Sequence, residues 1–483
     1  MKKHAVLAAG FTLLALAFLF FQCQNAATSA GGSSSSDTAT EGTASSVPLM
    51  KISNPNHPNV DVEPGIRFPD FGAMLDPGEY DGRVFLLSQD YPHQKPVQDE
   101  GVKSILSIDF KTNWEEYAIA VRDYVLEGNG NPGDIANSFY LEDNSVRPWY
   151  HVPWQHWGST GREGIHGLTR EGPIAKQMLA PEQTQTSYAY AVGFYNDLGG
   201  YHIGQVWPEV GPPVFEKLLE GNNFPVGTVV GKVLFTTLDA SQVPYLNNGV
   251  TWDAYVYAKD VPNSGKTDDS RMVAPVNLIQ MDIMVRDERA ASTGGWVFGT
   301  YVYNGNLNSE DSWKNLQPVG IMWGNDPDQR ESLNNPTPTK TEINPKLAET
   351  IINDDPSMPA MHLGWGHRLN GPVDNANSSC MSCHSTAQYP GVSAIMPFLQ
   401  NPAIPVPAVG TMASDAWMKW FRNVPCGTPF DEGQAISFDY SLQLQKSVEN
   451  YIEYLNTTKD GLYYLQYWDS PYKASRNALV ANE

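Results

Sequence analysis

The sequence predicts a multidomain protein, with a β-rich domain over residues 48–345 followed by a small all-α domain over residues 346–483. In the first range, short apolar runs alternate with breaks at Gly, Pro and Asn, which is typical of strands and turns. After about residue 345, this alternation gives way to short helical segments between prolines. Hydrophobic residues make up 41% of the chain and charged residues 17%, so there is ample material for packed cores.

The clearest strand patterns of the first range cover residues 228–238, 252–259, 276–286 and 296–304. The third of these alternates with a period of two, which predicts one buried face. Its expected buried set is Ile279, Met281, Ile283 and Val285, and the intervening set is Gln280, Asp282, Met284 and Arg286. A helix is expected before the strands over residues 114–127. Asn113 and Glu116 have the spacing of a capping box there, and Gly128 follows the helix.

Two helices are expected in the second range. One covers residues 413–424, with Ser414 or Asp415 as its cap and Pro425 as its stop. The other covers residues 441–456 and has one apolar face. That face consists of Leu444, Val448, Tyr451, Ile452 and Leu455.

The first 23 residues form a targeting segment, because a basic start is followed by an apolar run from Ala5 to Phe21 and then by Cys23. A cysteine at this place resembles a bacterial lipoprotein signal peptide, which implies that Cys23 carries lipid. An uncleaved anchor and an ordinary signal peptide are the alternatives. Residues 24–47 are small and polar and are expected to be a flexible linker. We therefore expect export to the bacterial periplasm or outer surface, with a lipid anchor to the membrane through Cys23.

The motif Cys380-Met381-Ser382-Cys383-His384 has the C-x-x-C-H spacing by which c-type haem is attached. Two cysteines three residues apart lie about one helical turn from each other, so both thiols can reach the vinyl groups on one edge of a porphyrin. The adjacent histidine is then directed at the iron as its proximal ligand. The motif predicts one covalent haem c, with iron bound by His384.

Other uses of these cysteines are less consistent with the sequence. A structural zinc site needs a second Cys or His pair at ligand spacing, and the chain has only Cys23 and Cys426 besides the motif. A thioredoxin-like C-x-x-C motif needs a βαβ setting and gains nothing from His384. Cys426 lies between Pro425 and Gly427, so we expect it on a loop without an intramolecular cysteine partner.

With this motif near its start and the helix over 441–456 near its end, the segment 370–460 resembles a class I cytochrome c domain. The resemblance implies that the all-α domain is cytochrome c-like and that a methionine is the sixth iron ligand. Met412, which follows Gly410-Thr411 just before a helix, is our first choice for this ligand. Met396 and Met418 are the other methionines considered, His367 is the alternative residue type, and an open position is the remaining possibility.

Two fragments of the β-rich range, residues 224–228 and 295–299, resemble the cytochrome P460 family, a β-fold with its haem motif near the end. No catalytic residue is carried over from that family, and we expect Lys232 to be a solvated strand residue. An aromatic cluster is expected to pack a loop onto the sheet rather than to form a pocket. Its members are Trp149, His151, Trp154, His156, Trp157 and His166.

These observations lead to two functional hypotheses. The first is electron transfer by a six-coordinate haem, and the second is an enzyme whose open sixth position binds or oxidises a small molecule. The net charge of −22 disfavours a nucleic-acid partner, because phosphates need a basic face. The same charge suits docking to a redox partner protein with a basic docking face.

Overall fold

The computed structural model describes residues 52–54, 57–62, 80–129, 139–155, 161–208, 213–219, 223–257, 271–333, 340–392, 404–431 and 435–456. The expected signal peptide, Cys23, the linker and Met396 lie outside these residues. The chain divides into two compact units between Pro48 and Leu49, so all described residues belong to the second unit.

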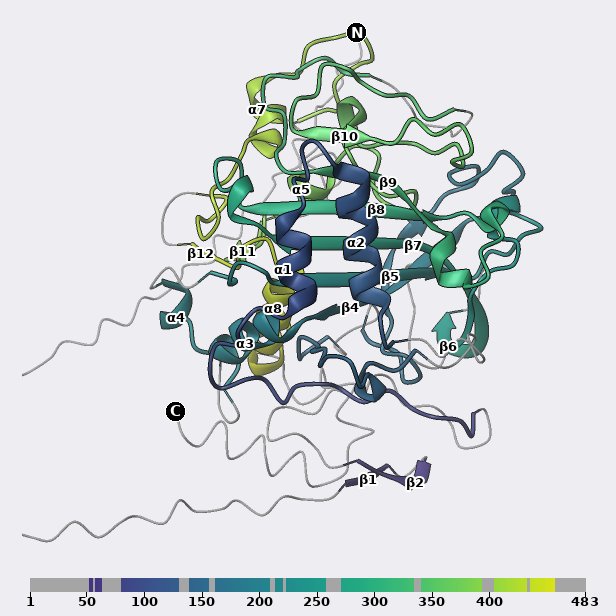
Figure 1. Cartoon of the computed structure of the whole chain (residues 1–483), viewed down its shortest axis with the longest axis vertical. Helices are drawn as coiled ribbons and strands as arrows, with labels where there is room; N and C mark the ends of the chain where they lie inside the picture. The colour runs from purple at the N-terminus through teal and green to yellow at the C-terminus, as the bar shows by residue number, and fades with distance from the viewer. Residues whose placement is uncertain are drawn as a thin grey trace, which may run out of the picture. The chain divides into compact units, whose positions relative to one another are not determined.

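An antiparallel sheet of eight strands forms the centre of the described residues, in the order β10-β9-β8-β7-β5-β4-β3, with β6 paired to β7 (Figure 1). The strands are β3 (Thr169–Ile174), β4 (Ser187–Tyr195), β5 (Val229–Thr236), β6 (Thr251–Tyr257), β7 (Arg271–Arg286), β8 (Trp296–Tyr303), β9 (Leu316–Met322) and β10 (Thr350–Ile352). Two short hairpins are separate from it: β1 (Ile52–Asn54) with β2 (His57–Val62), and β11 (Gln388–Tyr389) with β12 (Ile436–Ser437).

The β-rich character of the first range is confirmed, and the four predicted strands are β5, β6, β7 and β8. β7 begins at Arg271, earlier than predicted, and its first half pairs with β6 while its second half pairs with β5 and β8. The sequence analysis missed β3, β4, β9 and β10. β4 is buried along its whole length, so it carries no alternation from which a strand could be recognised.

The helices α1 (Glu100–Ser107) and α2 (Trp114–Leu126) lie across one face of the sheet (Figure 1). Gly231 of β5 allows a close approach there, since an added Cβ would lie 2.7 Å from Val125 of α2. Asn113 is the N-cap of α2, but its side chain makes no capping hydrogen bond, so the predicted capping box is wrong. Gly128 has the left-handed φ of +78° that the predicted helix end required.

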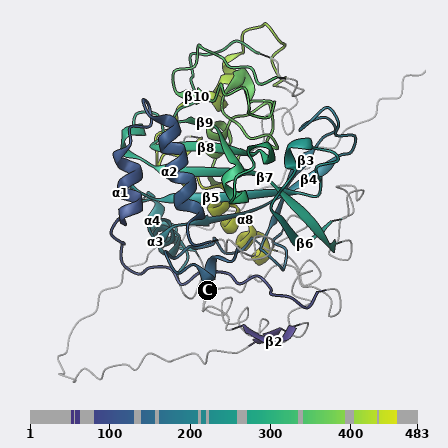
Figure 2. The same ribbon diagram turned by 45° about the vertical axis from the view of Figure 1, so that its right-hand side comes forward.

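The opposite face of the sheet is covered by segments from the C-terminal part of the chain, among them α5 (Cys380–His384) and α8 (Leu442–Asn456) (Figures 1 and 2). Gly193 of β4 allows a close approach on this side, because an added Cβ would lie 2.4 Å from the amide of Gln443. β7 is therefore buried on both faces. The remaining helices are α3 (Asp197–Val206), α4 (Glu216–Leu219) and α7 (Asp415–Met418), with 3-10 turns at Leu141–Asp143, Pro244–Leu246, Glu288–Ala290, Gly305–Leu307, Ser312–Asn315, Trp365–His367 and Lys419–Phe421.

The described residues after 345 are not all helical. β10 extends the large sheet, and β11 and β12 pair with each other. The helix predicted over 441–456 is confirmed as α8, with Leu444 and Val448 fully buried. The helix predicted over 413–424 is shorter. Ser414 caps α7 by accepting a hydrogen bond from the Trp417 N–H, and a 3-10 turn follows.

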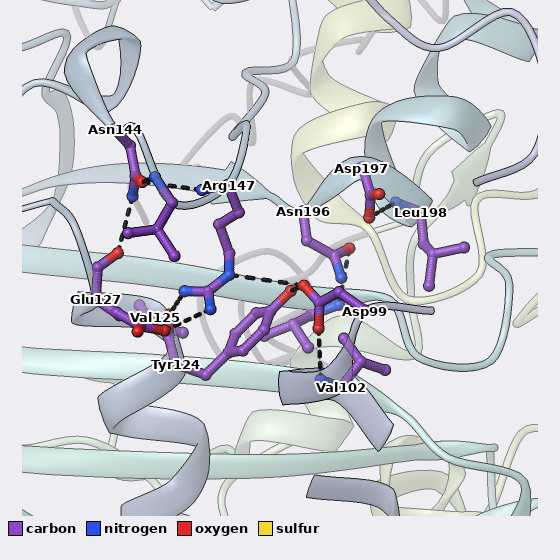
Figure 3. A network of polar contacts seen from close by, with 12 residues as sticks. Asp99, Val102, Tyr124, Val125, Glu127, Asn144, Arg147, Asn196, Asp197 and Leu198 are labelled. Atoms are coloured by element: carbon purple, nitrogen blue, oxygen red, sulfur yellow. Dashed lines mark hydrogen bonds and ion pairs between the residues drawn. The ribbon is translucent and has the colours of Figure 1, made fainter. Parts of the chain in front are cut away.

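A polar network fastens α1, α2 and the loop before β3 to one another (Figure 3). The Arg147 guanidinium lies 3.9 Å from the ring centre of Tyr124, and it donates to the Tyr124 carbonyl oxygen at 2.7 Å and to Glu127 Oε2 at 2.5 Å. The Tyr124 hydroxyl donates to Asp99 Oδ2 at 2.9 Å. Asp99 in turn accepts from the Val102 N–H at 2.7 Å as the N-cap of α1.

We expect Arg147→Met to lower the free energy of unfolding by about 1 kcal/mol, because the largely buried Arg147 side chain loses its hydrogen bond to the Tyr124 carbonyl oxygen and its partly exposed ion pairs. Urea unfolding followed by circular dichroism measures this change. Lys103→Met is the control, since Lys103 pairs with Glu100 on the exposed side of α1 and should change stability by less than about 0.5 kcal/mol. Equal effects of the two substitutions would contradict the role given to Arg147.

Candidate haem site

The five residues of the C-x-x-C-H motif form the short helix α5. Ser379 is its N-cap, and the Ser379 side chain accepts from the Ser382 N–H at 3.1 Å while the Ser379 N–H donates to Ser382 Oγ at 2.7 Å. This reciprocal capping box was missed in the sequence analysis, although the serines have the required spacing. It fixes where the helix begins and therefore how its side chains are directed.

The two faces of α5 have different environments. Met381 and Ser382 are fully buried in the protein core. Cys380, Cys383 and His384 are partly exposed and line a common cavity. The structure thus brings together the three residues that the motif predicted to act together.

His384 is held by a hydrogen bond between its Nδ1 and the carbonyl oxygen of Tyr440, at 2.8 Å. Since a carbonyl oxygen only accepts, Nδ1 carries the proton and the lone pair of the neutral ring is at Nε2. Burial lowers the pKa of His384 to about 4, which keeps the ring neutral at pH 7. A neutral imidazole with one nitrogen fixed by a backbone carbonyl is the usual form of an iron-ligating histidine.

The backbone that supplies this carbonyl is strained. Asp439 and Tyr440 have φ angles of +47° and +70°, which side-chain-bearing residues rarely adopt. Buried contacts hold the turn: Asp439 accepts from the N–H groups of Phe224 and Gly427, and the Tyr440 hydroxyl donates to the Val424 carbonyl oxygen at 2.5 Å. Backbone strain of this kind persists only where the surroundings impose it, often at a functional site.

Both motif cysteines are free thiols in the structure. Burial raises the pKa of Cys383 to about 11 and the pKa of Cys380 well above its ordinary value, so both are protonated at neutral pH. The Cys380 sulfur lies 3.7 Å from the Thr300 hydroxyl of β8, which places the start of α5 directly over the sheet.

The cavity beside α5 has a volume of about 1130 Å³, slightly above the usual range for ligand pockets, ~300–1,000 Å³. The sheet lines it through β3, β4, β5, β7 and β8, and α8 and the segments 362–379 and 406–409 complete the lining. Phe298 and Met284 supply apolar surface, and the Phe298 ring centre lies 5.1 Å from that of His384.

A row of polar residues lies on the sheet side of the cavity, where β4, β5, β7 and β8 pair residue by residue. In this register Lys232 is opposite Asp282, which is opposite Thr300. Lys232 forms an ion pair with Glu171 at 3.3 Å. Burial by itself lowers the pKa of Lys232, but the nearby carboxylates outweigh it and the pKa is raised. The expectation that Lys232 is a solvated strand residue is therefore wrong, because the second face of the sheet is covered.

The cavity suits a haem group in shape and chemistry. It is large, its lining is partly apolar, and both thiols and the His384 ring line it. Two nearly fully buried lining residues of the described chain, Trp365 and Asn450, also have a polar atom without a hydrogen-bond partner, Nε1 and Oδ1 respectively. Buried polar atoms are normally satisfied, so these two are available to a ligand with polar groups of its own.

None of the described candidates for the sixth iron ligand lines the cavity. Met412 is 68% exposed, Met418 is buried among core side chains, and His367 is buried near Gly364. Met412 stays a prediction, and it requires the segment before α7 to move when haem is attached. Met178, Met284 and His362 do line the cavity, and no sequence motif singles them out.

The other singled-out residues lie away from the cavity. Cys426 lies on a loop as expected, and its sulfur accepts hydrogen bonds from Arg286 at 3.0 Å and Asn223 at 3.5 Å. The described members of the aromatic cluster, Trp149, His151, Trp154 and His166, are almost fully buried, which supports their predicted packing role. His156 and Trp157 lie outside the described residues.

The two fragments at 224–228 and 295–299 come together in the structure. The ring centres of Phe224 and Trp296 are 5.6 Å apart, and Phe298 of the second fragment lies against His384. The β-rich part thus forms one side of the site.

Comparison of the chain with protein-family models, with curated proteins and with solved structures finds no match. In the described part of the chain, no cluster of three or more His, Cys, Asp or Glu side chains is arranged to hold a metal ion. None of the described helices combines the length and apolar character that crossing a membrane requires.

Proposed function

We propose that this protein carries one covalently attached haem c and transfers single electrons. The observation that supports this most is that Cys380, Cys383 and His384 line one cavity, with His384 held so that Nε2 is available to iron. A haem supplies a reversible one-electron couple when bound in this way.

The roles of the three side chains follow from this geometry. Each cysteine would hold the haem through a thioether, its S–H adding across one vinyl double bond so that no atom is lost. His384 orients its ring through Tyr440 and donates its Nε2 lone pair to iron. Phe298 and Met284 keep water from that side of the ring, which favours the neutral imidazole.

The segment from residue 346 is proposed to be the cytochrome c-like part, because it supplies the attachment helix and α8. It differs from a separate all-α domain in that the β-sheet forms part of the haem cavity. Export, lipid anchoring through Cys23 and a redox partner with a basic docking face complete the proposal. They are supported by the N-terminal sequence and the net charge of −22.

A haem enzyme is the second candidate, and the polar row on the cavity wall favours it. Lys232, Asp282, Glu171 and Asp374 all line the cavity. A site that only shuttles electrons has no use for such a row of ionisable groups at its wall, whereas an enzyme uses such groups to move protons.

Carbon monoxide distinguishes the two candidates. We expect the absorption spectrum of the reduced protein to stay unchanged when carbon monoxide is added, because a six-coordinate iron has no open position. The oxidised protein should then show the weak sulfur-to-iron band of a methionine ligand. If that band disappears in Met412→Ala, Met412 is the ligand, and if it persists there, another residue is the ligand. Rapid binding of carbon monoxide by the wild type would favour the enzyme.

A further inference from the structure

Asp282 and Asp374 share one amide group at the cavity wall. Gln280 is fully buried on β7, and its Nε2 donates to both oxygens of Asp282 at 2.9 Å and to Asp374 Oδ2 at 3.0 Å. Gln280 Oε1 accepts from the Val373 N–H at 3.2 Å, so the amide is fixed in orientation. One amide nitrogen therefore binds both carboxyl groups and holds them near each other.

The pair lies close to the attachment point of the haem. The Thr300 hydroxyl donates to Asp282 Oδ1 at 3.0 Å and also lies 3.7 Å from the Cys380 sulfur. The Thr300 hydroxyl thus lies between the Asp282 carboxyl and the Cys380 sulfur, which in the proposed function bonds the porphyrin edge. A charge at Asp282 therefore lies close to the point where the haem would be attached, in a partly buried medium that strengthens interactions between charges.

The charges around Asp282 do not balance. Lys232 on β5 is the cation that faces it, while Asp374 in the segment before α5 and Glu171 on β3 are acidic. Three carboxyl groups therefore face one ammonium group. Burial and the charge of Asp374 raise the pKa of Asp282 to about 7, although Lys232 opposes this.

The titratable groups of α5 do not compete for this proton once haem is attached. Cys380 and Cys383 are then thioethers, and the Nε2 of His384 is occupied by iron. The ionisable side chains that remain around Asp282 are Asp374, Glu171 and Lys232, and the haem carboxylates are the other groups of this kind in the cavity.

We propose that Asp282 takes up a proton when the haem is reduced, so that electron transfer by this protein is coupled to proton transfer. This inference rests on the proposed function and adds the proton acceptor to it. In the step, one electron passes from the redox partner to the ferric iron, and one proton passes from solvent to the Asp282 carboxylate, which becomes a carboxylic acid. Reoxidation of the haem releases the electron to an acceptor and the proton to solvent. Gln280 is a positioning residue, because its Nε2 holds the Asp282 and Asp374 carboxyl groups near each other.

Electrostatics determines in which direction reduction of the haem shifts the pKa of Asp282. The ferric haem carries one more positive charge than the ferrous haem, so it favours the carboxylate and gives Asp282 the lower pKa. Between the pKa values of the oxidised and reduced states, the reduction potential must fall as pH rises. When one proton is taken up with one electron, the limiting slope is about 59 mV per pH unit, because one pH unit is a tenfold change in proton concentration.

The test is a potentiometric titration of the haem-loaded protein from pH 5 to pH 9. We expect a sloping region near pH 7 in the wild type and its loss in Asp282→Asn. Asp374→Asn should move the slope to lower pH, because a negative neighbour is removed. Lys232→Met should move it to higher pH, because a positive neighbour is removed. Asp253→Asn, on an exposed position of β6, is the matched control and should keep the wild-type slope.

Infrared difference spectra of the reduced minus oxidised protein give a second readout. A carbonyl band of a protonated carboxylic acid should appear on reduction, and it should be missing in Asp282→Asn only. A slope that persists in Asp282→Asn would assign the proton to another group, such as a haem carboxylate, and would overturn the inference. A wild type with covalent haem and no slope would overturn it while leaving the proposed function intact. A protein without covalent haem would overturn both.

Discussion

Replacing Cys380 and Cys383 together by Ala is expected to abolish covalent haem attachment, so that haem is extracted from the variant by acidified ketone while it stays with the wild-type chain. The two thiols line one cavity on one face of α5, so both thioethers depend on them. Each single variant should keep haem through the remaining bond. Haem staining after denaturing electrophoresis and the mass of the intact chain measure the outcome directly.

Cys426→Ser is the matched control for this experiment. Cys426 is also a free, partly exposed thiol, but its neighbours are Arg286 and Asn223 rather than the cavity. A serine hydroxyl can accept the same two hydrogen bonds, so this variant should fold and retain its haem. Extraction of haem from the wild type, or loss of haem in Cys426→Ser, would refute the assignment of the two motif cysteines.

Replacing His384 by Gly should remove the proximal ligand while leaving both thioether cysteines in place. We expect the spectrum of the variant to change to that of an iron without its histidine. Added imidazole should restore most of the original spectrum, because the space of the missing ring is adjacent to the iron and the Tyr440 carbonyl can bind the added ring. Titration with imidazole, followed by absorption, measures the recovery.

His93→Gly is the control for His384→Gly, since His93 is exposed and lies outside the cavity lining. Its spectrum should equal that of the wild type with or without imidazole. If His384→Gly keeps the wild-type spectrum, another side chain is the proximal ligand, and His362 on the cavity wall becomes the first to examine.

The strand β7 shows how far the sequence determines the fold. The period of two correctly predicted a strand in which Ile279, Met281, Ile283 and Val285 are fully buried or nearly so, but the prediction of a single buried face was wrong. The residues that alternate with these on β7 were not expected to be covered, yet Gln280 is fully buried and Met284 and Arg286 are each 6% exposed. The alternation of apolar and polar residues distinguishes the two faces of β7. It does not reveal that a segment much later in the chain covers the polar face.

The same limit explains which residues of the candidate site could be predicted from the sequence. The motif was sufficient to predict that Cys380, Cys383 and His384 lie together, because this depends only on spacing within about one turn of helix. Lys232, Asp282 and Asp374 come together only through sheet register and the packing of a distant loop. The Tyr440 carbonyl is a backbone group in a strained turn, so its residue type carries no signal at all.

The arrangement of the covering layers also fixes an order of assembly. The sheet strands lie between the α1–α2 pair, which is synthesised early, and α5 and α8, which are synthesised last. Contacts between β4 and α8, such as that between Gly193 and Gln443, span more than 200 residues, and closures over such long stretches of chain form slowly. The growing chain therefore passes through a stage in which one face of the sheet is already packed and the other is bare. The wall that carries Gln443 and Asn450 closes only after α5 has emerged, so the cavity beside α5 is the last part of the described fold to be completed.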